Sequence, residues 1–181
     1  EKNNSIDKIF ITASGGPFLR LPESKMKKIS PNQALKHPNW SMGKKISIDS
    51  STMMNKVFEV IETQRIFNLP KSKINILIHE DSYLHAIVKF KNGITKLLIH
   101  DTKMEIPIFN TIYDQENQSF QTKNLDLKKL NNLKLHTVNK KKFPLINILN
   151  KISDQNSLFE TVIVACNDEL VNLFLKKKIS F

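Results

Sequence analysis

The segment Ile46-Ser47-Ile48-Asp49-Ser50-Ser51-Thr52-Met53-Met54-Asn55-Lys56-Val57-Phe58-Glu59-Val60-Ile61-Glu62 organises the rest of this 181-residue sequence. Its first residues predict a short strand, the Ser-Ser-Thr run predicts a turn, and the remainder predicts a helix. We expect Asp49 or Ser50 to cap this helix, because a short side-chain oxygen accepts a hydrogen bond from a free amide of the first turn.

The predicted helix has two unlike faces when its residues are placed at intervals of about 100°. The apolar face, which must pack on a core, comprises Met53, Met54, Val57, Phe58, Val60 and Ile61. The polar face comprises Asn55, Lys56, Glu59, Glu62 and Thr63. Its donors suit an anion, and Glu59 suits a divalent cation or the role of general base. A surface helix with a solvated polar face fits the same pattern.

The composition, with 40% hydrophobic and 25% charged residues, is that of an ordinary soluble globular protein. No apolar run is long enough to span a bilayer, so we expect no membrane partner. The single cysteine, Cys166, lies in an apolar run. We expect it to be a buried structural thiol in a protein of a reducing compartment.

A formal net charge of +11 is also found in nucleic-acid-binding proteins. However, only Arg20 and Arg65 among the 28 basic residues are arginine, and the lysines are spread along the chain. Phosphate and base recognition favours the bidentate guanidinium group. The lysine content therefore indicates the coding bias of an AT-rich genome, and we predict no nucleic-acid partner.

The remaining pattern predicts an α+β fold with a small, mostly antiparallel sheet packed with helices. The expected strands are residues 8–12, 74–78, 86–90 and 94–99. Lys91-Asn92-Gly93 is the turn of a predicted hairpin. Helical spacing is found over residues 31–35, 144–149 and 160–175, helical or irregular chain over 104–113, and short strand or extended chain over 125–135.

We divide the chain into a catalytic domain over residues 1–113, a linker over 114–137 and the start of a helical domain over 138–181. The chain begins at Glu1 rather than Met and enters a strand almost at once. The last helix has no partner helices for its apolar side. We therefore expect a fragment of a longer protein, with a truncated helical segment at its end.

Two loops carry further polar groups. Ala13-Ser14-Gly15-Gly16-Pro17-Phe18 predicts a tight turn with exposed amides. The segment His37-Pro38-Asn39-Trp40-Ser41-Met42-Gly43 contains the only tryptophan, and it either docks on its own domain or closes over a ligand. Together with the helix start at Ser50, these loops would make a phosphate pocket. Glu59 alone would be an incomplete Mg²⁺ site.

Three other histidines, His79, His85 and His100, invite a zinc interpretation. They lack a supporting thiol and the His-x₃-His spacing of a helical site. We interpret them as structural or surface histidines. The sequence also contains neither a Rossmann glycine fingerprint nor a P-loop.

Three motifs closely resemble, in order and spacing, those of the 1-deoxy-D-xylulose 5-phosphate reductoisomerases: Ala13–Phe18, His37–Gly43, and Asp49–Lys56 with Glu59. The similarity is strong over residues 8–113 and continues to 181. It implies an oxidoreductase and isomerase that uses NADPH and a divalent metal ion. The reaction converts 1-deoxy-D-xylulose 5-phosphate to 2-C-methyl-D-erythritol 4-phosphate in non-mevalonate isoprenoid biosynthesis. It also implies a homodimer.

The resemblance assigns roles to particular residues. The residues that would hold the substrate phosphate are Ser14, Ser50, Asn55 and Lys56, with His37 assisting. Glu59 would bind Mg²⁺, Mn²⁺ or Co²⁺. The catalytic residues that the resemblance implies are Glu59, His37 and Lys56. Trp40 would lie on a lid that contacts the substrate. Met42 and Met104 would pack near substrate and nicotinamide, and Gly43 near the NADPH cofactor.

The resemblance also implies that the nucleotide-binding domain and two further acidic metal ligands precede this segment. We therefore expect the chain alone to be inactive. Three departures from the family pattern are Val57 for a usual glycine, Glu80-Asp81 for Pro-Gln, and Thr102-Lys103 for Pro-Asp. A decayed copy that serves as a binding or dimerising module thus stays open, and a basic nucleic-acid-binding domain is a further, less favoured alternative. The expected location is the bacterial cytoplasm, or else a plastid-type organelle.

Overall fold

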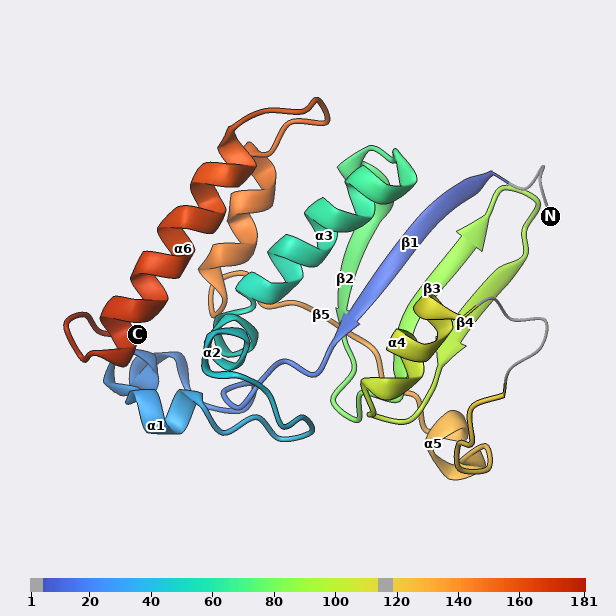
Figure 1. Ribbon diagram of the computed structural model, residues 1–181, viewed down its shortest axis with the longest axis horizontal. Coiled ribbons are helices and arrows are strands. Elements are labelled where there is room, and N and C mark those ends of the chain that lie inside the picture. Colours follow the sequence, from blue (N-terminus) through green and yellow to red (C-terminus); the bar gives the residue numbers. More distant parts are fainter. Residues whose placement is uncertain (1–4, 114–118) are drawn as a thin grey trace.

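The computed structural model describes residues 5–113 and 119–181. A five-stranded sheet forms its centre, with the strand order β4-β3-β1-β2-β5 (Figure 1). The strands are β1 (Ile6–Ala13), β2 (Ile74–Ile78), β3 (Leu84–Phe90), β4 (Thr95–Ile99) and β5 (His136–Thr137). Only the pair β1–β2 is parallel; the other three pairs are antiparallel. The predicted α+β class with a mostly antiparallel sheet is confirmed.

The helical elements lie largely between β1 and β2 and after β4. The α-helices are α1 (Pro31–Ala34), α2 (Lys44–Thr52), α3 (Met54–Phe67), α4 (Glu105–Ile112), α5 (Leu127–Asn131) and α6 (Phe159–Leu175). Three 3₁₀ helices are η1 (Glu23–Lys28), η2 (Lys71–Lys73) and η3 (Pro144–Lys151). The long crossover from β1 to β2 is required because parallel strands cannot be joined by a hairpin.

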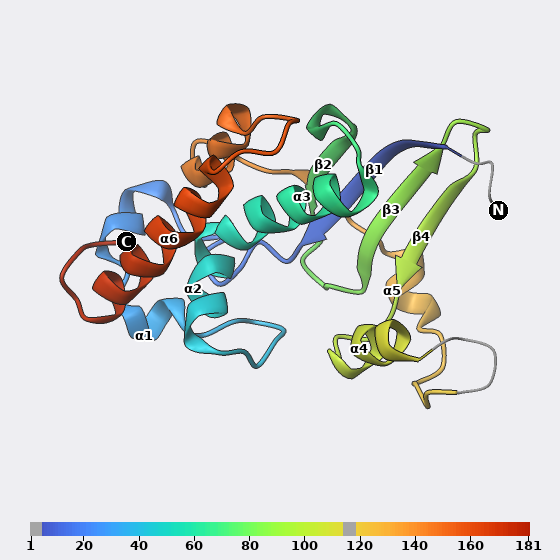
Figure 2. The same cartoon turned by 45° about the horizontal axis from the view of Figure 1, so that its top comes forward.

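Helix α3 joins the sheet to the C-terminal part of the chain. Val60 packs with Ile9, Ile11 and Ile74 of the sheet region in one apolar cluster. Met53, Met54 and Val57 belong to a second cluster, which includes Phe143, Ile146, Ile152 and Ile163 of the last forty residues. The 3₁₀ helix η3 therefore packs against α3, and α6 lies on the far side of η3 and contacts α2 (Figures 1 and 2). The predicted apolar face of α3 is confirmed.

The strand and turn predicted for residues 46–52 are wrong, because these residues belong to helix α2. The hydroxyls of Ser51 and Thr52 donate to the carbonyl oxygen of Ile48, at 2.7 and 3.1 Å, and thus bond within the helix. The chain turns later, at Met53, which has a φ of 65° and separates α2 from α3. A hydroxyl-rich run therefore ended a helix here instead of starting one.

The predicted cap at Asp49 or Ser50 is wrong for the same reason. Met53 occupies the N-cap position of α3 and makes no side-chain cap hydrogen bond. The carboxylate of Asp49 is buried and accepts from Lys45 at 2.7 Å and from Asn167 at 2.8 Å. Its partners lie on α2 and on the distant helix α6.

Two further sequence expectations need correction. Residues 127–131 form helix α5 instead of extended chain, with Asp126 as an N-cap that accepts from the Lys129 amide at 3.1 Å. Cys166 is exposed, because α6 buries Ile163, Asn167, Val171 and Phe174 on its other side. The position of Cys166 on the outer face of the helix therefore determines its exposure, although its neighbours in the sequence are apolar.

The structure describes only part of the linker that was predicted over residues 114–137. Residues 114–118 lie outside the described residues, and α5 and β5 fall in the rest. Strand β5 extends the sheet by pairing Thr137 with Leu77 and His136 with Ile78. The domain boundaries themselves stay a prediction.

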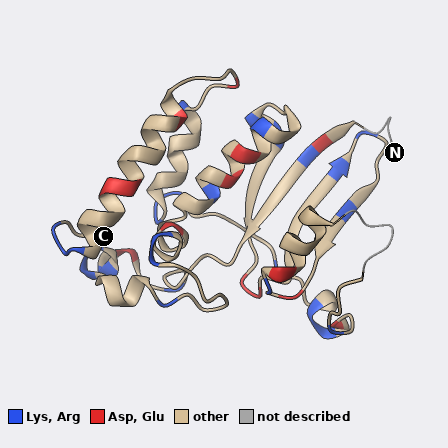
Figure 3. Cartoon of the chain, in the orientation of Figure 1, with Lys and Arg blue, Asp and Glu red and all other residues tan. Residues whose placement is uncertain are grey.

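Figure 3 shows lysine and arginine on helices, strands and loops across the chain, interspersed with acidic residues. Within residues 5–113 and 119–181, every helix falls short of the length and apolarity that crossing a membrane demands.

Candidate active site

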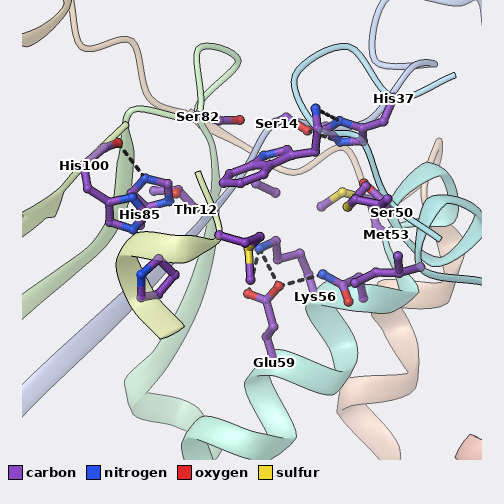
Figure 4. A pocket seen from close by; sticks show the side chains of 18 of the residues that line it. Thr12, Ser14, His37, Ser50, Met53, Lys56, Glu59, Ser82, His85 and His100 are labelled. Carbon is purple, nitrogen blue, oxygen red and sulfur yellow. Dashed lines mark hydrogen bonds and ion pairs between the residues drawn. The ribbon is translucent and has the colours of Figure 1, made fainter. Parts of the chain in front are cut away.

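A pocket of about 420 Å³ lies between helices α2 and α3 on one side and the β3–β4 region with α4 on the other (Figure 4). Its polar lining comprises Thr12, Ser14, His37, Ser50, Asn55, Lys56, Glu59, Ser82, His85 and His100. Its other lining residues are Ala13, Gly15, Trp40, Met42, Ile46, Met53, Leu98, Met104 and Pro107.

The junction of α2 and α3 supplies most of the charged and amide groups. Ser50 lies in the last turn of α2, and Asn55 and Lys56 lie in the first turn of α3. Glu59 follows three and four positions later, on the same face of the helix. Its carboxylate accepts from Asn55 Nδ2 at 2.7 Å and from Lys56 Nζ at 2.7 and 2.8 Å. This face therefore carries a compact, fully paired cation–anion group.

The glycine loop after β1 brings Ser14 close to the same helices. Gly16 has a φ of 67°, and a Cβ atom built on it would lie 2.9 Å from the Ser50 carbonyl oxygen. Only glycine satisfies both the backbone conformation and this close approach. The Ser14 hydroxyl accepts from the Gly16 amide at 3.2 Å. The loop is thus packed directly against the end of α2.

His37 faces Ser14 across the pocket rim, with its Nε2 atom 3.1 Å from Ser14 Oγ. Its Nδ1 atom accepts from the backbone amides of Asn39 and Trp40 at 3.1 and 3.0 Å. The proton of the neutral ring therefore sits on Nε2, which donates to Ser14. Burial, and then the positive charge of Lys56, lower the pKa of His37. The ring is a neutral donor at neutral pH.

The loop 37–43 is docked on its own chain and also lines the pocket. Asn39 Nδ2 donates to the Glu80 carbonyl oxygen at 2.7 Å and to Ser82 Oγ at 2.9 Å. Trp40 and Met42 both face the pocket. The sequence left open whether this loop docks on its own domain or closes over a ligand. The structure shows it docked, in a position that borders the pocket.

Nine of the ten residues that were assigned roles line this one pocket: Ser14, His37, Trp40, Met42, Ser50, Asn55, Lys56, Glu59 and Met104. Gly43 is the tenth; it stands at the N-cap of α2, next to Met42, and is not among the lining residues. The structure brings the nine together from five separate segments. The individual roles given to them stay predictions.

Sequence reasoning missed His85 and His100, which it interpreted as structural or surface histidines. Both line the pocket, with their rings stacked at a centroid distance of 3.6 Å. Burial chiefly lowers the pKa of His85 to about 4, and the charges of His100, Lys56 and His79 act in the same direction. One feature of the sequence could have identified them. His85 precedes and His100 follows the predicted hairpin, and pairing of its two strands brings the ends of the hairpin together.

The donor set fits a divalent cation only in part. Glu59 is the sole acidic residue among those that line the pocket. No group of three or more His, Cys, Asp or Glu that could hold a metal ion occurs within residues 5–113 and 119–181. Since Mg²⁺ takes six oxygen ligands, Glu59 could supply one, and substrate, water or residues outside this chain would supply the others.

Hydroxyl, amide and ammonium donors around one carboxylate, on an α+β scaffold, are the chemistry of proteins whose pockets suit a small anionic ligand. Two family models narrow this class. One, described as the 1-deoxy-D-xylulose 5-phosphate reductoisomerase C-terminal domain, matches residues 1–67, and one described as the DXP reductoisomerase C-terminal domain matches residues 100–181. The chain belongs to the 1-deoxy-D-xylulose 5-phosphate reductoisomerase family.

Curated relatives agree with this assignment. The chain is 60% identical over 180 residues to the 1-deoxy-D-xylulose 5-phosphate reductoisomerase of Pelagibacter ubique, covering 99% of the chain and 46% of that protein. It is 41% identical to the corresponding protein of Persephonella marina, covering 99% of the chain and 48% of that protein. The chain thus spans about half the length of the curated relatives it matches.

Solved structures share the fold. A DOX-P reductoisomerase in complex with NADPH, fosmidomycin and magnesium matches with a TM-score of 0.87 and 33% identity, over 97% of this chain and 43% of that one. The Zymomonas mobilis enzyme in complex with NADPH matches with a TM-score of 0.86 and 33% identity, over 97% and 45%.

Proposed function

We propose that the complete protein containing this chain converts 1-deoxy-D-xylulose 5-phosphate to 2-C-methyl-D-erythritol 4-phosphate with NADPH and a divalent metal ion. The observation that carries this proposal is the convergence of Ser14, Ser50, Asn55 and Lys56 with Glu59 in a single pocket. These residues come from separate segments, so a solvated helix face would not explain their meeting. Family membership supplies the reaction.

The phosphate would bind at the end of the pocket formed by Ser14, Ser50, Asn55 and Lys56. Two hydroxyls, an amide and an ammonium group provide donors, and the ammonium group provides the charge that a phosphate requires. Neutral His37 donates to Ser14 Oγ, which orients this hydroxyl and leaves its hydrogen free for a ligand oxygen. His37 would thus assist binding through Ser14.

Lys56 and Glu59 are paired with each other in this structure, with side chains that are 16% and 31% exposed. A bound phosphate would compete for Lys56, and a divalent cation would compete for Glu59. We infer that substrate and metal ion open this ion pair together, so each favours binding of the other. The metal ion, when bound, polarises the substrate oxygens as a Lewis acid.

The NADPH site would be mostly outside this chain. Met104 lines the pocket and is 54% exposed, so it could pack on a nicotinamide ring. Gly43 would contribute from the neighbouring loop. Since the phosphate-binding glycine motif of a nucleotide domain is missing from the sequence, we propose that the 181-residue chain alone is inactive.

The proposed assembly is a homodimer in the bacterial cytoplasm. Strand β4 is at the edge of the sheet and exposes Ile94, Leu97 and Leu98 around it. Unprotected apolar edge strands invite pairing with another copy. The relatives cited above are bacterial proteins, which supports the proposed location.

A decayed, non-catalytic copy is the second candidate, because of the departures from the family motifs. Val57, which stands at a usual glycine position, is fully buried in the cluster behind α3. It therefore fills the core without displacing the polar face of the helix. This departure alone does not argue for decay, but Thr102-Lys103 beside Met104 keeps the second candidate open.

The deciding experiment is an assay of the complete protein with 1-deoxy-D-xylulose 5-phosphate, NADPH and Mg²⁺, followed through the loss of NADPH absorbance. We expect metal-dependent turnover that a phosphonate substrate mimic inhibits. The 181-residue chain assayed alone should give none. A folded complete protein that binds the mimic but shows no turnover would support the decayed copy instead.

A further inference from the structure

One wall of the pocket, at the left of Figure 4, is made of two histidine rings that lie face to face. The rings of His85 and His100 are 3.6 Å apart between centroids, with an interplanar angle of 10°. The His85 Nε2 atom lies 3.0 Å from the backbone carbonyl oxygen of His100. One residue therefore contacts the His85 imidazole twice, through its backbone and through its ring.

The sheet creates this arrangement by an irregularity. The β3–β4 register steps from Leu84–Ile99 to Ala86–Leu98, so His85 is an extra residue in β3. Such a β-bulge re-aims a side chain that regular pleating would direct elsewhere. The His100 amide donates to the Tyr83 carbonyl oxygen at 3.2 Å. Backbone pairing thus holds both residues at the end of the hairpin.

The hydrogen bonds determine the tautomer of each ring. Because a carbonyl oxygen only accepts, the proton of neutral His85 is on Nε2. By the same argument His100 carries its proton on Nδ1, which lies 2.7 Å from the Asp101 carbonyl oxygen. His85 is neutral at neutral pH, since burial lowers its pKa to about 4. The groups whose charges act on it are His100, Lys56 and His79.

Trp40 is a second aromatic neighbour of the His85 ring. Its centroid is 6.4 Å from that of His85, at an interplanar angle of 67°, which is an edge contact. Trp40 belongs to the loop that also carries His37 and that Asn39 anchors to Ser82. The His85 imidazole therefore contacts both the ring of His100 and that of Trp40.

We propose that His100 is a positioning residue of the pocket, whose flat ring fixes the plane of His85 and thereby supports Trp40 and its loop. A single hydrogen bond from Nε2 would leave the His85 ring free to turn about the N–H···O axis. The stacked ring of His100 removes this freedom. The inference concerns the pocket wall and does not depend on the reaction proposed above.

This inference predicts that the flat shape of residue 100, and not its imidazole nitrogens, keeps Trp40 in place. His100→Phe keeps a flat ring, whereas His100→Ala removes it; neither removes the backbone carbonyl that holds His85. Trp40 is the only tryptophan of the chain, so its fluorescence emission reports on this wall alone. The second readout is the pKa of His85, measured by NMR titration of its ring in the 181-residue chain.

In His100→Ala we expect Trp40 emission to shift to longer wavelength and the pKa of His85 to rise from about 4 towards its ordinary value, because the ring gains solvent. His100→Phe should keep Trp40 emission, and the pKa of His85 should rise less than in the alanine variant, because only the charge of His100 is lost while the ring stays covered. His136→Ala, a change of an exposed histidine on β5, should alter neither. If circular dichroism shows that the alanine variant does not fold, His100→Leu, which has bulk without a flat face, replaces it.

Unchanged emission and pKa in His100→Ala would overturn the proposal, as would equal changes in the alanine and phenylalanine variants. Neither readout needs turnover. Loss of the proposed reaction in the complete protein would therefore leave the result on His100 intact.

Discussion

Asp49 and Asn167 are separated by 118 positions in the sequence, yet the Asn167 amide donates to the Asp49 carboxylate at 2.8 Å in the buried interior. The other carboxylate oxygen accepts from Lys45, which also contacts Asp168 at 3.2 Å. Burial opposes the charge of Lys45, but Asp49 and then Asp168 outweigh it and raise its pKa. Helix α6 thereby holds α2, which carries Ser50 to the pocket.

This relationship predicts a loss of stability in Asn167→Ala. The substitution leaves an oxygen of a carboxylate whose side chain is only 4% exposed without its partner. A buried charged group that loses a hydrogen bond costs about 1–3 kcal/mol, and we expect urea unfolding to show a loss in this range. Asp168→Ala removes only an exposed ion pair and should cost less than about 1 kcal/mol. Equal losses in the two variants would contradict the role of the buried bond.

Glu59→Gln in the complete protein should abolish metal-dependent turnover. The amide keeps the size of the side chain but loses the negative charge that a divalent cation requires. Because Glu59 is partly exposed and pairs on the surface of α3, the free energy of unfolding should change by less than about 1 kcal/mol. The measurements are NADPH oxidation against Mg²⁺ concentration and urea unfolding. Near-normal turnover would remove Glu59 from the metal site.

Lys56→Ala in the complete protein should chiefly weaken substrate binding. A hydrogen bond to a charged group is worth about 1.5–3 kcal/mol, so KM should rise by roughly tenfold to a hundredfold. Lys44→Ala, which removes an exposed lysine of α2 outside the pocket lining, is the matched control for charge. A larger fall in kcat than rise in KM would instead place Lys56 in the chemical step.

Gly16→Ala should destabilise the protein more than Gly93→Ala. Both glycines have positive φ, at 67° and 88°, so both substitutions carry backbone strain of about 1 kcal/mol or more. Only at Gly16 would the new Cβ meet other atoms, with the Ser50 carbonyl oxygen at 2.9 Å; at Gly93 it meets nothing within 4 Å. The difference in free energy of unfolding therefore measures the close approach of the loop to α2. Equal losses of unfolding free energy in the two variants would mean that the loop can move away from α2 without destabilising the protein.

The depressed pKa of His85 predicts acid destabilisation between pH 6.5 and about 4. In this window the unfolded chain binds a proton that the folded ring does not, so stability is complete above pH 6.5 and falls as the pH is lowered. For a partly exposed ring we expect a loss on the order of 1 kcal/mol. The measurement is the urea midpoint against pH, compared between the wild type and His85→Gln. Parallel pH profiles of the two proteins would refute the assignment.

Local sequence pattern determined much of this protein. The alternation of apolar residues defined β1, β2 and the β3–β4 hairpin, and the helical period placed Val57 and Glu59 on opposite faces of α3. These features depend on neighbours within a few residues, which propensity and periodicity describe. The site residues Ser14, His37 and Lys56 were found through motif resemblance, because their pattern alone also fitted a turn, a loop and a wet helix face.

Only the tertiary structure decided the features that depend on distant partners. Helix α2 carries Asp49, whose carboxylate is held by Asn167 from 118 positions away, a contact that no local pattern reveals. A one-residue bulge turned His85 into the pocket, where it meets His100. Burial among groups far apart in the sequence changes both conformation and pKa. The polar face of α3 therefore became a wall of a pocket only through the loops and strands packed around it.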